Sequence, residues 1–243
     1  MPIRIETLKT TDASKAADIF ARYPDEQPDF DAQCRPLFGA IEGAIAATDG
    51  LGHMPLWSEY TNVKNYGRKP MGANPQRRMN DVRTKANFCR FYAWLAATLA
   101  PDAIIEVGAA FGASGMYWLA GLKLADTGTL YSFEPNADWH PIAKENFDLI
   151  APRHVLTLGT FEDTADRIKA PASIVLIDAI HTRDFVTAQL DLARQHAKSG
   201  ALILFDDINF SDEMAACWAD IQASNEWAGV WQLGARVGVI ELP

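Results

Sequence analysis

Apolar runs alternate with helical periodicities from residue 103 to near the C-terminus. Short, nearly continuous apolar runs bounded by turn residues predict strands that are buried on both faces. These runs lie near residues 103–107, 129–134, 154–158, 173–178 and 201–206. Between them, apolar positions of helical period predict helices over 113–124, 139–150, 162–169, 183–197 and 212–224. Such alternation is typical of a parallel sheet with helices on both faces.

The C-terminal end departs from this alternation. Two further apolar runs, 229–233 and 236–242, are separated only by Gly234 and Ala235. A link this short permits an antiparallel hairpin but not a crossover helix. We therefore predict an α/β fold with a Rossmann-like sheet, in which an antiparallel C-terminal hairpin follows five parallel strands.

The first hundred residues are predicted to be mostly helical. One apolar helical face is formed by Leu37, Phe38, Ile41 and Ile45. We therefore divide the chain into an N-terminal helical extension with a substrate lid, residues 1–79, and a core domain, residues 80–243.

The lid is predicted from residues 50–75, which are rich in Gly, Pro and Asn. This composition indicates a loop, and long loops in compact proteins often form lids or binding loops. Trp57, Tyr60 and Tyr66 are interspersed in this loop and are expected to cover a bound molecule. After the loop, Asn80 or Asp81 is expected to cap a helix that continues to about Ala100 and is stopped by Pro101.

Composition limits the class of protein. The chain has 243 residues, of which 49% are hydrophobic, enough for a sizeable core. Its three cysteines are far apart, which favours a reducing compartment over a disulfide framework or a zinc site. The N-terminus lacks a signal-peptide pattern, and no apolar run is long enough to span a bilayer. We expect a cytoplasmic protein without a membrane partner, and the sequence is compatible with a homo-oligomer.

Charge is distributed unevenly along the chain. The net charge of −9 argues against a general nucleic-acid binder. Residues 61–90, however, contain eight Lys and Arg residues against one acid, Asp81. One interpretation is a solvated face. The other is a segment that recruits an anionic small molecule.

The loop after the first predicted strand of the core is the most informative segment. It follows Glu106 and carries Gly108 and Gly112, after which a helix begins near Ala113. Glycines permit close approach of the backbone to a ligand, and a helix N-terminus offers unpaired amides. A carboxylate beside this loop would repel a pyrophosphate, but it suits a ligand with an amino group and ribose hydroxyls. S-adenosylmethionine is such a ligand.

The second predicted strand ends in Glu134, 28 residues after Glu106. In nucleoside-binding α/β folds, an acid at this place accepts hydrogen bonds from the ribose. The alternative is a solvated carboxylate at a strand end. Glu134 ends the second predicted strand as Glu106 lies near the end of the first, and this matching position favours ribose binding.

Three further carboxylates are expected at one edge of the sheet. Asp178 ends the fourth predicted strand, and Asp206 and Asp207 end the fifth. Because the carboxyl ends of parallel strands meet at one edge, these side chains can converge. They would repel one another unless something positive lay between them. Oxygen ligands at this density suit Mg²⁺, or else Ca²⁺ or Mn²⁺. Alternatively, Asp206 and Asp207 cap the following turn, and Asp178 lies near the cofactor.

With these motifs identified, the chain resembles the class I methyltransferase superfamily, and within it the small-molecule O-methyltransferases of the catechol type. The resemblance covers about residues 80–243. It rests on five strings: Glu106-Val107-Gly108-Ala109-Ala110-Phe111-Gly112-Ala113-Ser114, Phe133-Glu134-Pro135-Asn136, Leu158-Gly159-Thr160-Phe161-Glu162-Asp163, Leu176-Ile177-Asp178-Ala179-Ile180-His181 and Gly200-Ala201-Leu202-Ile203-Leu204-Phe205-Asp206-Asp207.

The resemblance implies a role for each cofactor residue. Gly108, Gly112 and Ser114 would enclose the methionine end of S-adenosylmethionine, with Glu106 supporting the loop. Glu134, followed by Pro135, would hold the ribose. Phe161 and Glu162 would lie beside the adenine, and Asp178 near the cofactor. Ala110 replaces the aromatic residue of the catechol enzymes, so that one packing contact differs.

The resemblance also implies a catalytic centre. Metal-dependent catechol enzymes carry Asp, Asp and Asn where this chain has Asp178, Asp206 and Asp207. Asp207 therefore keeps an oxygen ligand at the third position but adds a negative charge. His181 lies at the loop position of the family's catalytic lysine. A histidine there is able to take a proton from a substrate hydroxyl. It could instead be a metal ligand, or a histidine that faces water at the start of a helix.

These observations together predict an S-adenosylmethionine-dependent methyltransferase that acts on a small molecule, with Mg²⁺-assisted transfer to a hydroxyl and an acceptor that carries an anionic group. A metal-independent N-methyltransferase is the first alternative. A nucleotide-binding or assembly protein of the same fold and a dinucleotide dehydrogenase are the others. Retention of the carboxylates argues against a pure binding protein, and Glu106 and the C-terminal hairpin argue against a dehydrogenase.

Overall fold

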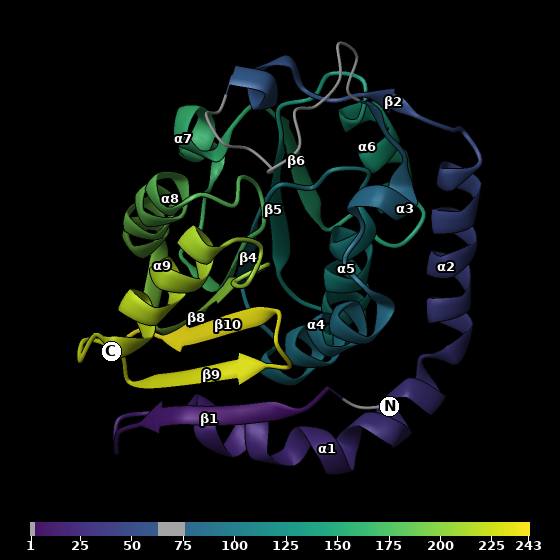
Figure 1. Ribbon diagram of the computed structural model, residues 1–243. Coiled ribbons are helices and arrows are strands. Elements are labelled where there is room, and N and C mark those ends of the chain that lie inside the picture. Colours follow the sequence, from purple (N-terminus) through teal and green to yellow (C-terminus); the bar gives the residue numbers. More distant parts are fainter. Residues whose placement is uncertain (1–2, 63–75) are drawn as a thin grey trace.

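An eight-stranded mixed sheet forms the centre of the computed structural model, which describes residues 3–62 and 76–243 (Figure 1). The strand order is β1-β9-β10-β8-β7-β4-β5-β6. Its parallel part consists of β4 (Ala103–Val107), β5 (Thr129–Glu134), β6 (His154–Leu158), β7 (Ala172–Ile177) and β8 (Ala197–Phe205). These are the five predicted strands, and the predicted parallel core is confirmed.

The predicted C-terminal hairpin is confirmed as well. Strand β9 (Gly229–Leu233) turns into β10 (Val237–Glu241), and the two pair antiparallel. Strand β10 also pairs antiparallel with β8, and thus lies between β8 and β9. The turn between β9 and β10 is therefore placed beside the chain that leaves β8.

One strand of the eight-stranded sheet was not predicted. Residues Ile5–Thr10 form β1, which pairs antiparallel with β9 and closes that side of the sheet. Figure 1 shows β1 in purple beside the yellow hairpin, so the two ends of the chain contribute neighbouring strands. The N-terminal region therefore shares the sheet of the core domain.

The helices cover both faces of the sheet because successive strand residues point to opposite faces. On one face, Ile104, Ile174 and Leu202 pack in a cluster with α4 (Ala86–Leu99), α5 (Ala113–Ala125) and α6 (His140–Asp148). On the other, Ile105 and Val175 pack with α8 (Arg183–His196) and α9 (Asp212–Ala223). The predicted helix over 162–169 is divided into α7 (Phe161–Thr164) and the 3₁₀ turn η2 (Ala165–Arg167).

The N-terminal region is helical, as predicted. It contains α1 (Ala16–Gln33), α2 (Arg35–Asp49) and α3 (Met79–Val82), with short strands β2 (Met54–Pro55) and β3 (Gln76–Arg77) and the 3₁₀ helix η1 (Ser58–Asn62). The predicted apolar face of α2 is confirmed, since Phe38, Ile41 and Ile45 are buried. No helix in the described part of the chain is long and apolar enough to cross a membrane.

The predicted start of the helix before Pro101 is wrong. The amide of Arg78 donates to the Asp81 carboxylate at 3.0 Å, so Asp81 closes the first turn of the short helix α3 and does not cap a longer one. The chain then extends through Arg83 to Lys85, and α4 begins only at Ala86. The predicted end is correct, because Ala100 leaves the helix with a φ of +45° directly before Pro101.

Candidate functional site

The loop between β4 and α5 requires glycine at two positions. Gly108 has a φ of +94°, and a Cβ there would lie 2.2 Å from the carbonyl oxygen of Asp178. Gly112 has a φ of +90° and precedes the first residue of α5. These positions favour glycine because an L side chain would be strained or would clash. The loop after β4 is thereby packed directly against the chain that leaves β7.

Glu134, at the end of β5, fixes the same loop. Its Oε2 accepts a hydrogen bond from the amide of Ala110 at 2.7 Å, and its Oε1 accepts one from the amide of Asn136 at 2.8 Å. Ala110 has a φ of +48°, so the hydrogen bond stabilises a backbone conformation that is unusual for alanine. Burial raises the pKa of Glu134 to about 7, although the two hydrogen bonds act in the opposite direction.

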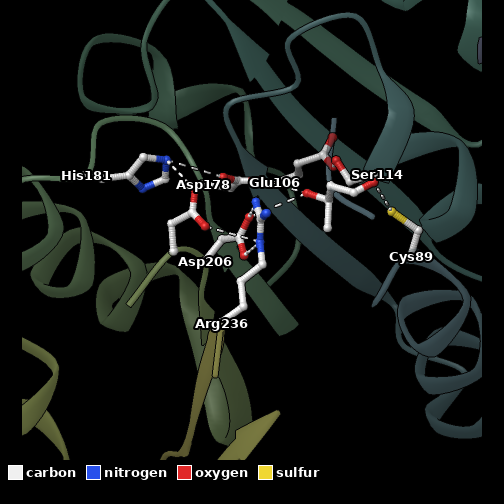
Figure 2. A network of polar contacts seen from close by, with 9 residues as sticks. Cys89, Glu106, Ser114, Asp178, His181, Asp206 and Arg236 are labelled. Atoms are coloured by element: carbon white, nitrogen blue, oxygen red, sulfur yellow. Dashed lines mark hydrogen bonds and ion pairs between the residues drawn. The ribbon is translucent and has the colours of Figure 1, made fainter. Parts of the chain in front are cut away.

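Glu106 is buried inside the sheet. Its Oε1 accepts a hydrogen bond from the Ser114 hydroxyl at 2.7 Å (Figure 2). Its Oε2 accepts one from the Ser132 hydroxyl at 2.6 Å. The side chain is 0% exposed, and burial raises its pKa to about 7. Glu106 therefore joins β4 to β5 and α5 and positions Ser114. Both oxygens of Glu106 are thus used by serine hydroxyls inside the protein, and not by the backbone of the loop.

Two adjoining cavities open where the strands end. The first, of about 500 Å³, contains six predicted residues in its lining: Gly108, Ala110, Ser114, Asp178, His181 and Asp207. The second, of about 450 Å³, contains Pro135, Phe161 and Glu162. Tyr60, Gly108 and Ala179 line both cavities, so the two spaces meet there. The predicted cofactor, metal and catalytic residues all lie in the described part of the chain, and among them Glu106, Gly112, Glu134 and Asp206 line neither cavity.

The structure brings the three predicted carboxylates together. Asp178 follows β7, and Asp206 and Asp207 follow β8. The hydroxyl of Thr84, a residue the sequence analysis did not include, lies 3.4 Å from Oδ2 of Asp178 and 3.5 Å from Oδ2 of Asp206. Burial and the neighbouring carboxylates of Asp206 and Asp207 raise the pKa of Asp178 well above its usual value.

Arg236 supplies the positive charge in this cluster. Its Nε donates to Oδ1 of Asp206 at 2.7 Å, and its Nη2 donates to Oδ2 at 2.6 Å (Figure 2). Its Nε also lies 3.3 Å from Oδ1 of Asp207. Burial acts to lower the pKa of Arg236, but the hydrogen bonds and the carboxylates outweigh it and raise the pKa. Arg236 lies in the turn between β9 and β10 and was not among the site residues predicted from the sequence.

The predicted ligand set for a divalent ion does not fit this geometry. Both carboxylate oxygens of Asp206 are engaged by the guanidinium, and Asp207 is in contact with it. A cation bound by these two residues would lie against another cation, which is unfavourable. The described residues also contain no group of three or more His, Cys, Asp or Glu side chains arranged to hold a metal ion.

His181 faces the cluster from the loop before α8. Its Nε2 lies 3.8 Å from Oδ1 of Asp178 (Figure 2). The same nitrogen lies 3.6 Å from Oδ2 of Asp207. The Phe210 ring lies beside it, with 5.2 Å between the ring centroids. Burial lowers the pKa of His181 below its usual value, while the carboxylates of Asp207 and Asp206 oppose the shift. The imidazole is therefore neutral at pH 7 and able to accept a proton.

The basic segment is largely paired where the structure describes it. Arg83 donates to Glu42 at 2.9 Å, Arg90 lies 3.3 Å from Asp31, and Arg78 lies 3.7 Å from Asp81 and 3.8 Å from Asp49. Arg77 and Arg83 line the first cavity. Lys64, Tyr66, Arg68 and Lys69 lie outside the described residues. Of the predicted covering aromatics, Trp57 lines the second cavity and Tyr60 both.

Residues 105–208 match the model of a family described as a methyltransferase domain. No curated protein matches the chain. Among solved structures, the chain is similar to the O-methyltransferase TomG from Streptomyces achromogenes, involved in tomaymycin synthesis and solved with S-adenosylmethionine. The two are 15% identical, with a TM-score of 0.57 over 67% of this chain and 82% of that one.

Two other solved structures show the same likeness. An O-methyltransferase from Bacillus cereus, in complex with S-adenosylhomocysteine, is 16% identical, with a TM-score of 0.55 over 83% of this chain and 99% of that one. A putative O-methyltransferase from Klebsiella pneumoniae is 18% identical, with a TM-score of 0.54 over 66% of this chain and 81% of that one. Likenesses at these identities establish a shared fold, and the predicted Rossmann-like methyltransferase fold is confirmed.

Proposed function

We propose that this chain is a class I methyltransferase dependent on S-adenosylmethionine and that it transfers the methyl group to a hydroxyl oxygen of a small molecule. The observation that carries the proposal is the pair of adjoining cavities at the carboxyl ends of the strands. Ligands of open α/β sheets bind at this edge. One cavity accommodates the nucleoside of the cofactor, and the other accommodates the acceptor.

The second cavity suits the adenosine part of the cofactor. Phe161 and Pro135 provide apolar surface there, and Glu162 lies at the same wall. Glu134 already accepts two backbone hydrogen bonds, but a carboxylate is able to accept about four. Its remaining lone pairs are available to ribose hydroxyls after a small rearrangement. The methionine part then passes Gly108, where the two cavities meet.

The first cavity suits the acceptor and its activation. An acceptor hydroxyl beside His181 attacks the sulfonium methyl carbon of the cofactor. The new oxygen–carbon bond forms as the carbon–sulfur bond breaks, S-adenosylhomocysteine leaves, and the hydroxyl proton passes to the unprotonated nitrogen of the His181 imidazole. Such an in-line displacement gains mainly from alignment of the reactants. The carboxylate of Asp207, whose Oδ2 lies 3.6 Å from Nε2 of His181, stabilises the imidazolium that forms.

Transfer to oxygen is favoured over transfer to nitrogen by the O-methyltransferases with the same fold. A neutral amine would attack without a base, so an N-methyltransferase would have less use for His181. The proposal also omits divalent-metal assistance, because Arg236 engages the carboxylates that would bind the ion.

An anionic group on the acceptor is part of the proposal. Arg77 and Arg83 line the first cavity, on the side of the N-terminal region. Arg83 donates to Glu42 and Arg77 donates to the carbonyl oxygen of Gln76, each at 2.9 Å, and a guanidinium has five N–H donors, so both side chains retain donors for such a group. An acceptor with a carboxylate or phosphate fits this arrangement.

The experiment that tests the reaction uses S-adenosylmethionine labelled with ¹³C in the transferred methyl group. The protein is incubated with a panel of small hydroxyl- and amine-bearing compounds, each with and without a carboxylate or phosphate. The chemical shift of the labelled carbon distinguishes an O-methyl from an N-methyl product. We expect O-methyl products from anionic hydroxyl compounds. Transfer only to nitrogen would support the alternative function.

A further inference from the structure

We propose that the guanidinium of Arg236 takes the place of a divalent cation in the carboxylate cluster, so that methyl transfer proceeds without a metal. Arg236 is then a positioning residue: it holds Asp206 and Asp207, and through Asp207 it orients His181. The consequence for catalysis rests on the proposed function. The exclusion of a divalent cation does not rest on that function, because it depends on the contacts of the cluster alone.

The backbone places Arg236 firmly at the cluster. Its carbonyl oxygen accepts a hydrogen bond from the amide of Ile208 at 3.0 Å, and Gly238, two residues later, pairs with Phe205. The turn between β9 and β10 is thus attached to the loop that carries the two aspartates. The guanidinium reaches Asp206 from a backbone that is already fixed.

The conformation of Asp207 lets both aspartates face the same cation. Consecutive residues of an extended strand point to opposite faces. Asp207 has a φ of +52°, and this left-handed conformation brings its carboxylate to the side of Arg236, to which Asp206 already points. A non-glycine residue with this backbone conformation is uncommon. The local fold is therefore consistent with a site built around one guanidinium.

The contacts of Arg236 leave little room for a competing ion. Charge-assisted bidentate pairs between arginine and carboxylate are among the stronger protein hydrogen bonds. Here both oxygens of Asp206 are used, at 2.7 and 2.6 Å, and Asp206 is 1% exposed. A divalent ion would have to displace the guanidinium and leave its charge in a partly buried place. Removal of the arginine side chain should instead free the oxygens for a metal ion.

Arg236 also connects the cluster to the proposed base. Nε of Arg236 lies 3.3 Å from Oδ1 of Asp207, and Oδ2 of the same carboxylate lies 3.6 Å from Nε2 of His181. The guanidinium and the imidazole are therefore held on opposite oxygens of one side chain. Loss of Arg236 should change the orientation of Asp207 and lower the transfer rate by about 10- to 100-fold, as for other residues that orient a functional side chain.

The test measures Mn²⁺ binding by electron paramagnetic resonance in the wild-type protein, Arg236→Ala and Arg236→Ala combined with Asp206→Asn. Arg153→Ala is the matched control, because Arg153 forms an ion pair with Asp126 away from the cavities. We expect the wild-type protein and the control to bind no Mn²⁺ specifically. Arg236→Ala should gain one bound Mn²⁺, and the double variant should lose it. Transfer by the wild-type protein should be unchanged after exhaustive chelation.

Two results would overturn the inference. One is a stoichiometric Mn²⁺ site in the wild-type protein that Asp178→Asn abolishes. The other is a folded Arg236→Ala variant that gains no Mn²⁺. If Arg236→Ala does not fold, the wild-type titration still decides, and Arg236→Gln provides the second variant. Failure of the proposed function has a different outcome, since the Mn²⁺ results would then hold while no methyl group is transferred.

Discussion

The carboxylate of Glu134 accepts a hydrogen bond from the amide of Ala110, at 2.7 Å. This contact joins the end of β5 to the loop after β4, the two segments expected to hold the ribose and the methionine of the cofactor. A ligand that binds Glu134 therefore acts on the loop as well. The loop and the strand end behave as one binding element, which has consequences for variants of Glu134.

Replacement of Glu134 by Ala should weaken the binding of S-adenosylhomocysteine by about 1–3 kcal/mol, the usual cost of losing hydrogen bonds to a charged group. Isothermal titration calorimetry measures this loss. The exposed Glu145, on α6, provides the control variant Glu145→Ala, which should bind as the wild-type protein does. An unchanged affinity in Glu134→Ala would remove Glu134 from the binding site.

Glu106 should make the protein less stable as pH rises. Its pKa is about 7 in the folded protein and 4.5 ordinarily, so between these pH values the folded state retains a proton that the unfolded state has lost. The free energy of unfolding should therefore fall across this window, by up to roughly 3 kcal/mol from this group. Glu134 adds a slope of the same sign.

Glu106→Gln tests this dependence, because the amide is neutral at every pH. Urea unfolding between pH 4.5 and pH 7 should show a flatter dependence for the variant than for the wild-type protein. The hydroxyls of Ser114 and Ser132 can still bond to the amide. Equal slopes for the two proteins would mean that Glu106 is ionised in the folded state.

His181 should determine the acid limb of the pH–rate profile. The neutral imidazole is the active form, and burial lowers its pKa below the ordinary 6.5. The transfer rate should therefore rise with pH and level off below about pH 6.5. His181→Ala should lose this limb and about 10²–10⁴-fold in rate. The deficit should shrink at high pH, where the acceptor hydroxyl ionises unaided.

The control for His181 is His140→Ala, since His140 lies beside the carbonyl oxygen of Leu156, away from both cavities. Its pH–rate profile should match that of the wild-type protein. A His181→Ala variant with full activity and an unaltered acid limb would exclude His181 as the base.

The KM for the acceptor should depend on salt if the acceptor is anionic. Exposed charges are screened at high ionic strength, so KM should rise as salt is added. Arg77→Ala should raise KM and weaken its salt dependence, because Arg77 lines the first cavity. Arg22→Ala, an exposed ion-pair variant on α1, should leave both unchanged. A KM that does not respond to salt would return the basic segment to the solvated-face interpretation.

The sequence predicted the core of the sheet well because its strands are buried on both faces. Ile104 and Ile105 face the two apolar clusters of the fold, and such strands appear as continuous apolar runs. Strand β1 gave no comparable pattern. Only Ile5 and Leu8 are large apolar residues in it, and its partner β9 lies more than 200 residues away. Pairing at that distance is a property of the whole fold.

The three aspartates of the candidate site were predicted from the sequence, but the contacts that they make were not. Asp178, Asp206 and Asp207 meet as strand order requires. The sequence indicated that their charge needs a cation, but the identity of the cation depended on where the turn after β9 lies. That turn brings Arg236 to Asp206 across 30 residues of chain. Ser132, a polar residue within an apolar strand opposite Glu106, was the available indication that Glu106 is satisfied internally.

The central claim is that the two cavities form one site, with the cofactor's nucleoside in the second and the acceptor in the first. A crystal structure with S-adenosylhomocysteine tests it most directly. We predict the adenine against Phe161 and Pro135, the sulfur near Gly108, and open space between the sulfur and His181 for the acceptor. A nucleoside bound in the first cavity, against His181 and Asp207, or no binding at this edge of the sheet, would contradict the account.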